Sequence, residues 1–127
     1  MKNYWITTGG IFGFLAVMLG AFGAHGLKET LSPEMMDIFR TGVLYHLIHS
    51  VIILVIGISG NRKFFKAALM FTIGIILFSF SLYLYSVTSI KTFAMITPLG
   101  GVSFLIGWLM VIISGVSISR NKSKDIN

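Results

Sequence analysis

The sequence contains no cysteine, and only 11% of its 127 residues are charged. Without cysteine the chain has no structural disulfide, thiolate metal site or thiol redox chemistry, which excludes a small quinone-linked disulfide oxidase. Its four acidic residues all lie outside the long apolar segments, in connections or in the C-terminal tail. No carboxylate is therefore available inside those segments for proton coupling or for completing a zinc site.

Hydrophobic residues make up 55% of the chain, and the mean hydropathy is +0.89. These values are those of an integral membrane protein rather than of a soluble domain. The net charge of +6 comes from basic residues scattered at segment ends. Such a distribution indicates membrane topology and gives no basis for nucleic-acid binding.

Four apolar segments have the length that spans a bilayer, about 20 residues each. They cover about residues 4–27, 40–59, 64–86 and 97–119, and the second helix is expected to begin earlier, so that the four helices cover about 4–27, 33–59, 64–86 and 97–119. We therefore expect an all-α fold, an integral membrane four-helix bundle with antiparallel neighbours. Residues 1–127 would form this single transmembrane domain, ending in a basic tail at 120–127.

The basic residues predict the orientation of the bundle, because loops rich in Lys and Arg face the cytoplasm. If the helices alternate in direction, both termini and the Asn61–Lys66 connection lie on one side. That side carries Lys2, Arg62, Lys63, Lys66, Arg120, Lys122 and Lys124, against Lys28, Arg40 and Lys91 on the other. Both termini are therefore expected to be cytoplasmic.

The second helix has a clear start signal before its apolar part. Ser32 can cap the helix, Pro33 suits the first helical position, and Glu34 faces the positive helix end. Starting at Pro33, this helix is longer than the hydrocarbon layer. Its first two turns are expected to form a short amphipathic extension in the extracytoplasmic interface.

Two histidines, His46 and His49, lie within the apolar part of that second helix. At about 100° per residue they share one face with Gly42 and Tyr45. Counted from Thr41, they lie roughly 8 and 12 Å into the apolar layer. At that depth both rings need polar partners, so we expect this face to point into the bundle.

Small and polar residues form matching stripes on the other helices, as expected where helices approach closely in lipid. The third segment aligns Ser79 with Tyr83, and Trp108 in the fourth is expected to be a core residue whose indole N–H needs an acceptor. The candidate packing glycines are Gly9, Gly13, Gly20, Gly42, Gly100 and Gly107.

His25, at the end of the first segment, does not follow the small stripe of its own helix. As part of a regular helix it points about 150° away from the middle of that stripe. It joins the other histidines only if the helix breaks or twists among Gly20, Gly23 and Gly26. By geometry alone, the simpler interpretation is that His25 marks the outer interface.

Four motifs carry a resemblance to a known family: "GAFGAHGL", "TGVLYHLIHS", "LFSFSLY" and "TPLGGVSFLIGW". In this order, over nearly the whole chain, they resemble the YgdD/YwdK family of small membrane proteins, a domain of unknown function. The resemblance implies a four-helix protein of the bacterial plasma membrane and supplies no activity. Its characteristic residues include His25, Tyr45, His49, Ser79, Ser81, Tyr83 and Thr97. His46 is less typical, and Phe80 stands where the family often has glycine, which would loosen helix contact near Ser79 and Ser81.

The extracytoplasmic half of the bundle thus collects a candidate polar cluster. Its members are His25, Tyr45, His46, His49, Ser79, Tyr83 and Thr97. A hydrogen-bonded knot that fixes helix register is one interpretation. A site for a lipid head group, a quinone or a haem is another.

The remaining function classes are less well supported by the residues. A small-solute or proton-linked transporter would have to use His49 in place of a carboxylate within a span, and no second titratable group continues a path from it to the cytoplasmic side. No nucleophile and base arrangement of an enzyme is recognisable. We therefore expect a non-enzymatic interaction, assembly or accessory subunit, with the lipid bilayer and a membrane protein or a second copy as partners. No cofactor or metal is expected.

Overall fold

The computed structural model describes residues 3–127, and over that range the chain is all-helical, without a strand. Four stretches are long and apolar enough to cross a membrane, which confirms the predicted all-α membrane fold. They are α1 (Trp5–Gly26), α2 (Pro33–Ser59), a third span made of η1 (Arg62–Phe64), α3 (Phe65–Gly74), η2 (Ile75–Ser79) and α4 (Phe80–Thr88), and α5 (Lys91–Ile126).

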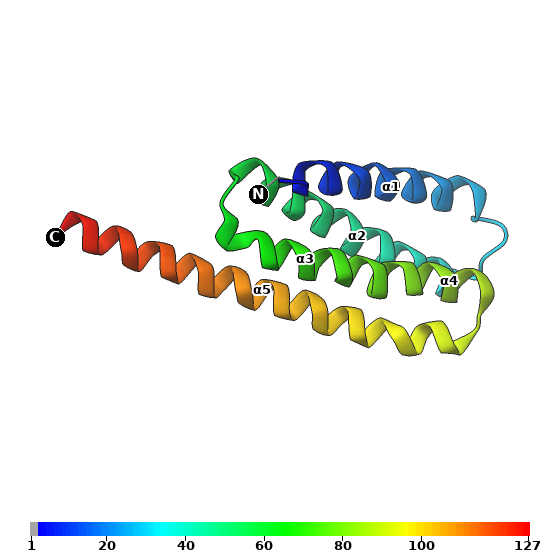
Figure 1. Cartoon of the computed structure of the whole chain (residues 1–127). Coiled ribbons are helices and arrows are strands. Elements are labelled where there is room, and N and C mark those ends of the chain that lie inside the picture. Colours follow the sequence, from blue (N-terminus) through cyan, green and yellow to red (C-terminus); the bar gives the residue numbers. More distant parts are fainter. Residues whose placement is uncertain (1–2) are drawn as a thin grey trace.

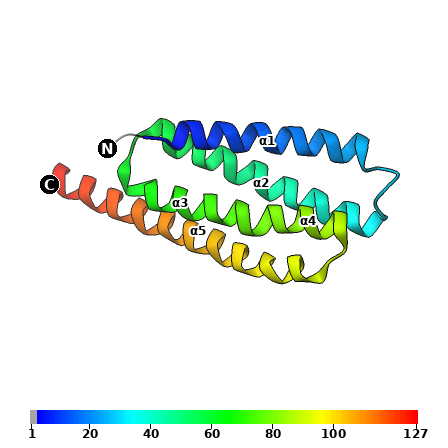
Figure 2. The ribbon, with the colours of Figure 1, turned by 45° about the vertical axis from the view of Figure 1, so that its right-hand side comes forward.

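The four spans lie side by side in chain order, from α1 to α5 (Figures 1 and 2). α1 packs mainly on α2, α2 on the third span, and α5 on the other side of that span. Half of the most apolar stretch of the third span is buried, against 17% for α1 and for α5. The third span is therefore the centre of the bundle, and α1 and α5 are its edges.

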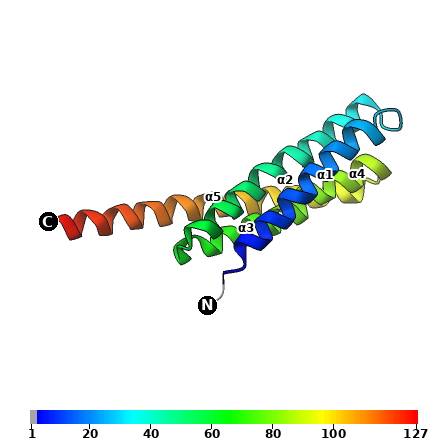
Figure 3. The ribbon, with the colours of Figure 1, turned by 90° about the horizontal axis from the view of Figure 1, so that it is seen from above.

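Both termini lie at the same end of the molecule, and the C-terminal part of α5 projects beyond the other helices (Figures 1 and 3). The connection between α2 and α3 lies at this end too. We call it the basic end, because it carries Arg62, Lys63, Lys66, Arg120, Lys122 and Lys124. Lys2, counted with them in the sequence, lies outside the described residues.

Both ends of α2 follow from local chemistry. The Ser32 hydroxyl accepts a hydrogen bond from the Met35 amide at 3.2 Å, and Pro33 occupies the first turn. At the other end Gly60 adopts φ 64°, a left-handed conformation that glycine reaches without steric cost. Its N–H bonds to the Gly57 carbonyl and closes the helix.

The last helix differs from the predicted 97–119. α5 begins at Lys91, after a connection of only Ser89 and Ile90, and continues to Ile126, so the expected basic tail 120–127 is helical almost to its end. Pro98 lies inside the helix, where it removes one N–H donor near the start. A hydrogen bond from Thr97 to Ser81 at 2.6 Å holds this part of α5 against the third span, so the helix continues through the proline.

The third span contains a feature that the sequence did not reveal, the π-helical segment η2. Wide turns of this kind occur mostly as single insertions in α-helices, frequently at functional sites. Gly42 of α2 packs beside η2, because a Cβ there would lie 3.2 Å from the Ser79 carbonyl oxygen. Gly100 of α5 faces the backbone of Phe78. The two glycines let α2 and α5 approach the wide turn closely.

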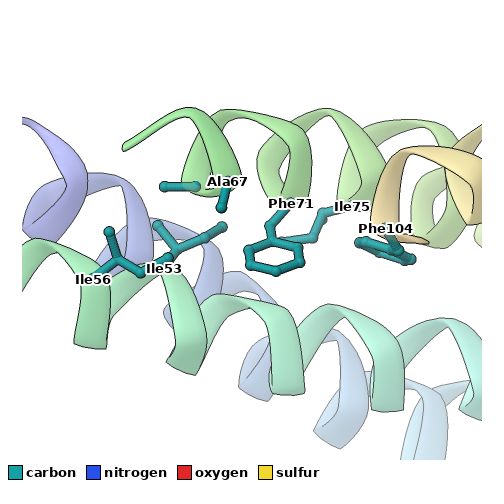
Figure 4. Close-up of a cluster of buried hydrophobic side chains, with 7 residues drawn as sticks. Ile53, Ile56, Ala67, Phe71, Ile75 and Phe104 are labelled. Carbon is teal, nitrogen blue, oxygen red and sulfur yellow. The ribbon is translucent and has the colours of Figure 1, made fainter. Parts of the chain in front are cut away.

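The main buried cluster joins the third span to α2 and α5 (Figure 4). Phe71 and Ile75 project from the third span and are fully buried. Ile53 and Ile56 come from α2, and Phe104 comes from α5. In lipid such contacts stabilise through close packing rather than through removal from water. Phe71 therefore lies where three of the four spans meet.

Candidate functional site

His25 stays apart from the other histidines. α1 remains helical as far as Gly26, so the twist that a three-histidine site requires does not occur. The side chain of His25 is exposed in the last turn of α1. A pair of opposed imidazoles formed by His25 and a histidine of α2, as bis-histidine haem ligation would need, is thus not built.

His46 is enclosed among aromatic rings from two other helices, α1 and α4. Its exposed fraction is 0%, and its ring centroid lies 5.9 Å from that of Phe12 on α1 and 5.5 Å from that of Phe80 on α4. The Nδ1 atom is 2.8 Å from the Tyr83 hydroxyl, which gives the imidazole one hydrogen bond across the α2–α4 interface. The Nε2 atom is buried and makes no hydrogen bond to the described part of the chain.

His49 points toward α5 and has partners for both ring nitrogens. Nδ1 is 2.7 Å from the Tyr45 carbonyl oxygen, and the Trp108 indole N–H donates to Nε2 at 3.1 Å. A carbonyl can only accept and an indole N–H can only donate. We therefore assign His49 as the neutral imidazole with its hydrogen on Nδ1. A proton, a metal ion or a haem iron at Nε2 would have to displace Trp108.

The ring of His49 also stacks on Phe104. Their centroids are 3.8 Å apart and their planes differ by 11°. Phe71 lies against the same ring at 5.3 Å and against Trp108 at 5.3 Å. Hydrogen bonding and stacking together fix the position of His49 between α2, the third span and α5.

The hydroxyl residues of the predicted cluster separate into different places. The Thr97 hydroxyl bonds to Ser81, as described above. Ser79, the last residue of η2, is fully buried, and its Oγ makes no hydrogen bond within residues 3–127. Tyr45 is 40% exposed, and its ring packs on Phe78 with the centroids 4.6 Å apart. The structure thus does not join the seven predicted residues in one cluster.

An open groove runs between α2 and α5 over the third span, and we call it the α2/α5 groove. Its first part encloses about 350 Å³ and its second about 260 Å³, and Trp108 lines both. The first part is lined by Tyr45, His49, Phe78, Gly101, Phe104, Leu105 and Trp108, and the second by Ile52, Val55, Ile56, Ser59, Phe64, Trp108 and Val111. No helix of residues 3–127 covers this groove.

The six candidate packing glycines all face other helices of this chain. A Cβ at Gly9 would lie 2.6 Å from the Leu54 backbone nitrogen, whereas Gly13 makes only ordinary contact with Ser50. The neighbours of Gly20, Gly42, Gly100 and Gly107 are Val43, Tyr83, Phe78 and Phe71 respectively. The small stripes are therefore occupied within the monomer, so they no longer argue for a partner.

Sequence reasoning treated Trp108 as a core residue, and it overlooked Phe104 and Phe71 altogether. Trp108 is 40% exposed and is the donor that fixes His49. One signal was available, the expectation that a buried indole N–H needs an acceptor. The imidazoles of His46 and His49 were two of the possible acceptors within the apolar segments.

Together these features define a small membrane protein of four transmembrane helices, with neutral histidines held in an aromatic interior. Residues 19–101 match the family described as Protein of unknown function (DUF423), and the chain belongs to this family. Nothing in that description indicates an enzymatic activity.

Named relatives match over most of their length. The UPF0382 membrane protein YwdK of Bacillus subtilis is 42% identical over 117 residues, which cover 88% of this chain and 95% of the relative. The UPF0382 inner membrane protein YgdD of Escherichia coli K12 is 34% identical over 123 residues, 94% of each chain. A UPF0382 membrane protein of Staphylococcus epidermidis is 41% identical over 113 residues, 87% of this chain and 93% of the relative. No solved structure matches this protein.

Proposed function

We propose that this chain is a non-enzymatic assembly protein of the bacterial plasma membrane that associates through the α2/α5 groove. The occupant we propose for the groove is α5 of a second copy. The observation that carries this proposal is the exposure of Trp108 and Tyr45, 40% each, in a groove that the described helices leave open. Polar aromatic rings usually lie at membrane interfaces or find partners when they lie deeper.

The shape of α5 supports a self-complementary contact. At about 100° per residue, Gly101, Leu105, Trp108 and Ile112 lie on one side of this helix. Leu105 and Ile112 project from it, 70% and 61% exposed, while Gly101 leaves space beside Phe78. In a twofold dimer each ridge would lie in the groove of the other copy, since the same surface serves both partners.

We also propose that the basic end of the molecule faces the cytoplasm. Of the described basic residues, six lie at that end and Lys28, Arg40 and Lys91 lie at the other. An excess of Lys and Arg in short connections sets this orientation in bacterial membranes. A reporter that is active on one side only, fused after Asn127, tests this assignment.

Association can be tested by disulfide scanning, because the natural chain has no cysteine. Single variants Leu105→Cys, Leu109→Cys and Ile112→Cys are oxidised mildly in native membranes. We expect a covalent homodimer for at least one of these positions. The matched control is Phe14→Cys on α1, since Phe14 is 69% exposed and Leu105 is 70% exposed.

The outcome separates the possible occupants of the groove. The proposal is overturned if none of the three α5 variants forms a covalent dimer, or if Phe14→Cys forms as much covalent dimer as they do. A covalent product with a different protein instead of a second copy would replace the proposed occupant with that protein.

A second candidate function is binding of a small, flat, lipid-soluble ligand such as a quinone in the first part of the groove. The observation in its favour is that the Tyr45 hydroxyl makes no hydrogen bond within residues 3–127, although its ring lines a hollow of about 350 Å³. A carbonyl group of the ligand could accept that hydrogen bond. Haem is disfavoured, because His25 is remote and Nε2 of His49 is occupied by Trp108.

This candidate predicts saturable quenching of Trp108 fluorescence by a short-chain quinone. Trp5→Phe removes the only other tryptophan and isolates the signal. Tyr45→Phe should weaken binding roughly 3- to 10-fold, the effect of one lost hydrogen bond. The control Tyr4→Phe lies away from the groove and should leave binding unchanged. Quenching that rises linearly with the quinone concentration, or that is the same in the Tyr45→Phe variant, would exclude this ligand.

A further inference from the structure

A second hollow lies at the basic end, far from the histidines. It encloses about 360 Å³ and is lined by Arg62, Lys63 and Lys66 from the start of the third span and by Ile113, Ser114 and Ser117 from α5. The Ser114 hydroxyl donates to the Lys63 carbonyl oxygen at 2.9 Å, and Lys63 Nζ lies 3.5 Å from the Ser117 hydroxyl oxygen. These two contacts fix the α5 wall against the cationic segment.

Two more cations on α5 extend the same wall. At about 100° per residue, Arg120 and Lys124 lie on the side of the helix that carries Ile113 and Ser117. These four residues, with Ile112, Val116 and Asn121, line an adjoining hollow of about 380 Å³. The two hollows share Ile113 and Ser117, so five cationic side chains border one continuous region.

No acidic side chain of the described residues neutralises this region. The ion pair that the structure contains within residues 3–127 joins Arg40 and Asp37 at the opposite end. Asp125 follows Lys124 on α5 but is turned about 100° from it. The five cations therefore face an open hollow with two serine hydroxyls and no counter-ion from the chain.

Below the cations the same wall becomes apolar. Ile112, Ile113 and Val116 are 54–61% exposed and continue toward the bilayer interior. A surface with hydroxyls and cations at the membrane boundary and aliphatic side chains beneath them matches a phospholipid, with its phosphate above and its acyl chains below. We propose that this region binds an anionic phospholipid, with its phosphate between Lys63 and Ser117 and its excess negative charge facing Arg62, Lys66, Arg120 and Lys124.

Anionic lipids are selected here by net charge. A zwitterionic lipid carries the same phosphate, but its own cationic group repels the lysines and arginines. Each Lys or Arg near an anionic membrane surface strengthens binding roughly five-fold. The site should therefore prefer phosphatidylglycerol to phosphatidylcholine, and the preference should fall as cations are removed.

The test is native mass spectrometry of the full chain in detergent with equal amounts of phosphatidylglycerol and phosphatidylcholine. The wild type should retain phosphatidylglycerol preferentially. The variant Arg62→Gln/Lys63→Gln/Lys66→Gln should reduce this preference on the order of 100-fold. The control Lys28→Gln/Arg40→Gln/Lys91→Gln removes three cations from the opposite end and should retain it.

A second variant guards against misfolding or inverted insertion of the first. Arg120→Gln/Lys124→Gln changes only the projecting part of α5, which packs on no other helix, and should reduce the preference roughly 20-fold. Equal loss in the opposite-end control, or no lipid preference in the wild type, overturns the proposal. Displacement of the lipid by millimolar inorganic phosphate would instead assign the hollow to a soluble anion. A failed homodimer test leaves this proposal intact, because the five cations that carry it lie outside the α2/α5 groove and the two surfaces share only Ile112.

Discussion

Replacing Gly100 with alanine is expected to destabilise the protein by about 1–3 kcal/mol. An added Cβ would meet the backbone nitrogen of Phe78 and lie 2.7 Å from the carbonyl carbon of Leu77. Backbone atoms cannot rotate away as a side chain can, so α5 would have to move off the third span. Unfolding by dodecyl sulfate in mixed micelles, followed by circular dichroism, measures the loss.

The same substitution elsewhere supplies the control. Gly10 and Gly115 have no atom within 4 Å of an added Cβ. Gly10→Ala and Gly115→Ala should be neutral, or should stabilise by up to about 1 kcal/mol, because alanine favours a helix more than glycine does. If Gly100→Ala is as stable as these two variants, then the backbone of α5 at Gly100 does not pack directly on Phe78 of η2.

The sequence was sufficient to predict the class of fold, because the length of each apolar segment and the capping residues of α2 are local features of the chain. The ends of α5 could not be predicted in this way. The Thr97–Pro98 pair is typical of a helix start, yet the helix begins at Lys91, because the Ser81–Thr97 hydrogen bond and the Gly100 contact hold residues near the proline against the third span. These are tertiary contacts between segments, and a local pattern cannot reveal them.

Because the predicted start of the last helix was Thr97 instead of Lys91, the sequence did not reveal that Trp108 is the partner of His49. His49 lies sixteen residues after Pro33, about 24 Å along α2, and Trp108 lies seventeen residues after Lys91, about 26 Å along α5, which runs parallel to α2. Measured from Thr97, Trp108 would lie only about 17 Å along. The true starts bring the two side chains to the same depth, where the indole N–H meets Nε2.

The sequence correctly predicted that His46 and His49 point into the bundle, but it did not predict which helices each ring contacts. Both rings point into the bundle, yet His46 meets α1 and α4 while His49 meets α5. The two rings therefore lie on different sides of the inward face of α2, one toward α1 and α4 and the other toward α5. Because η2 widens the third span at Ser79, the positions of its side chains could not be obtained from regular helical spacing.

The binding of His49 to Trp108 has a consequence for function. With both nitrogens satisfied by neutral partners, His49 connects α2 to α5 and forms the inner wall of the α2/α5 groove. A carrier of protons would have to exchange these partners in each cycle. His49 thus serves better as a fixed part of a binding surface, which agrees with the proposed association through the groove.

Phe71 supports that wall from beneath, and Phe71→Ala is expected to have the largest effect on stability. Its ring is fully buried and contacts His49 and Trp108 from the third span. Truncation leaves a cavity of roughly 100 Å³, and the cavity alone costs about 2.4 kcal/mol at 24 cal/mol per Å³. Unfolding by dodecyl sulfate measures the change, and the Trp108 emission spectrum should shift as its packing against Phe71 is lost.

Phe14→Ala is the control, because Phe14 is 69% exposed on α1, and this variant should lose less than about 0.5 kcal/mol of stability. Equal losses for the two variants would contradict a packed centre at Phe71 and with it the fixed position of His49.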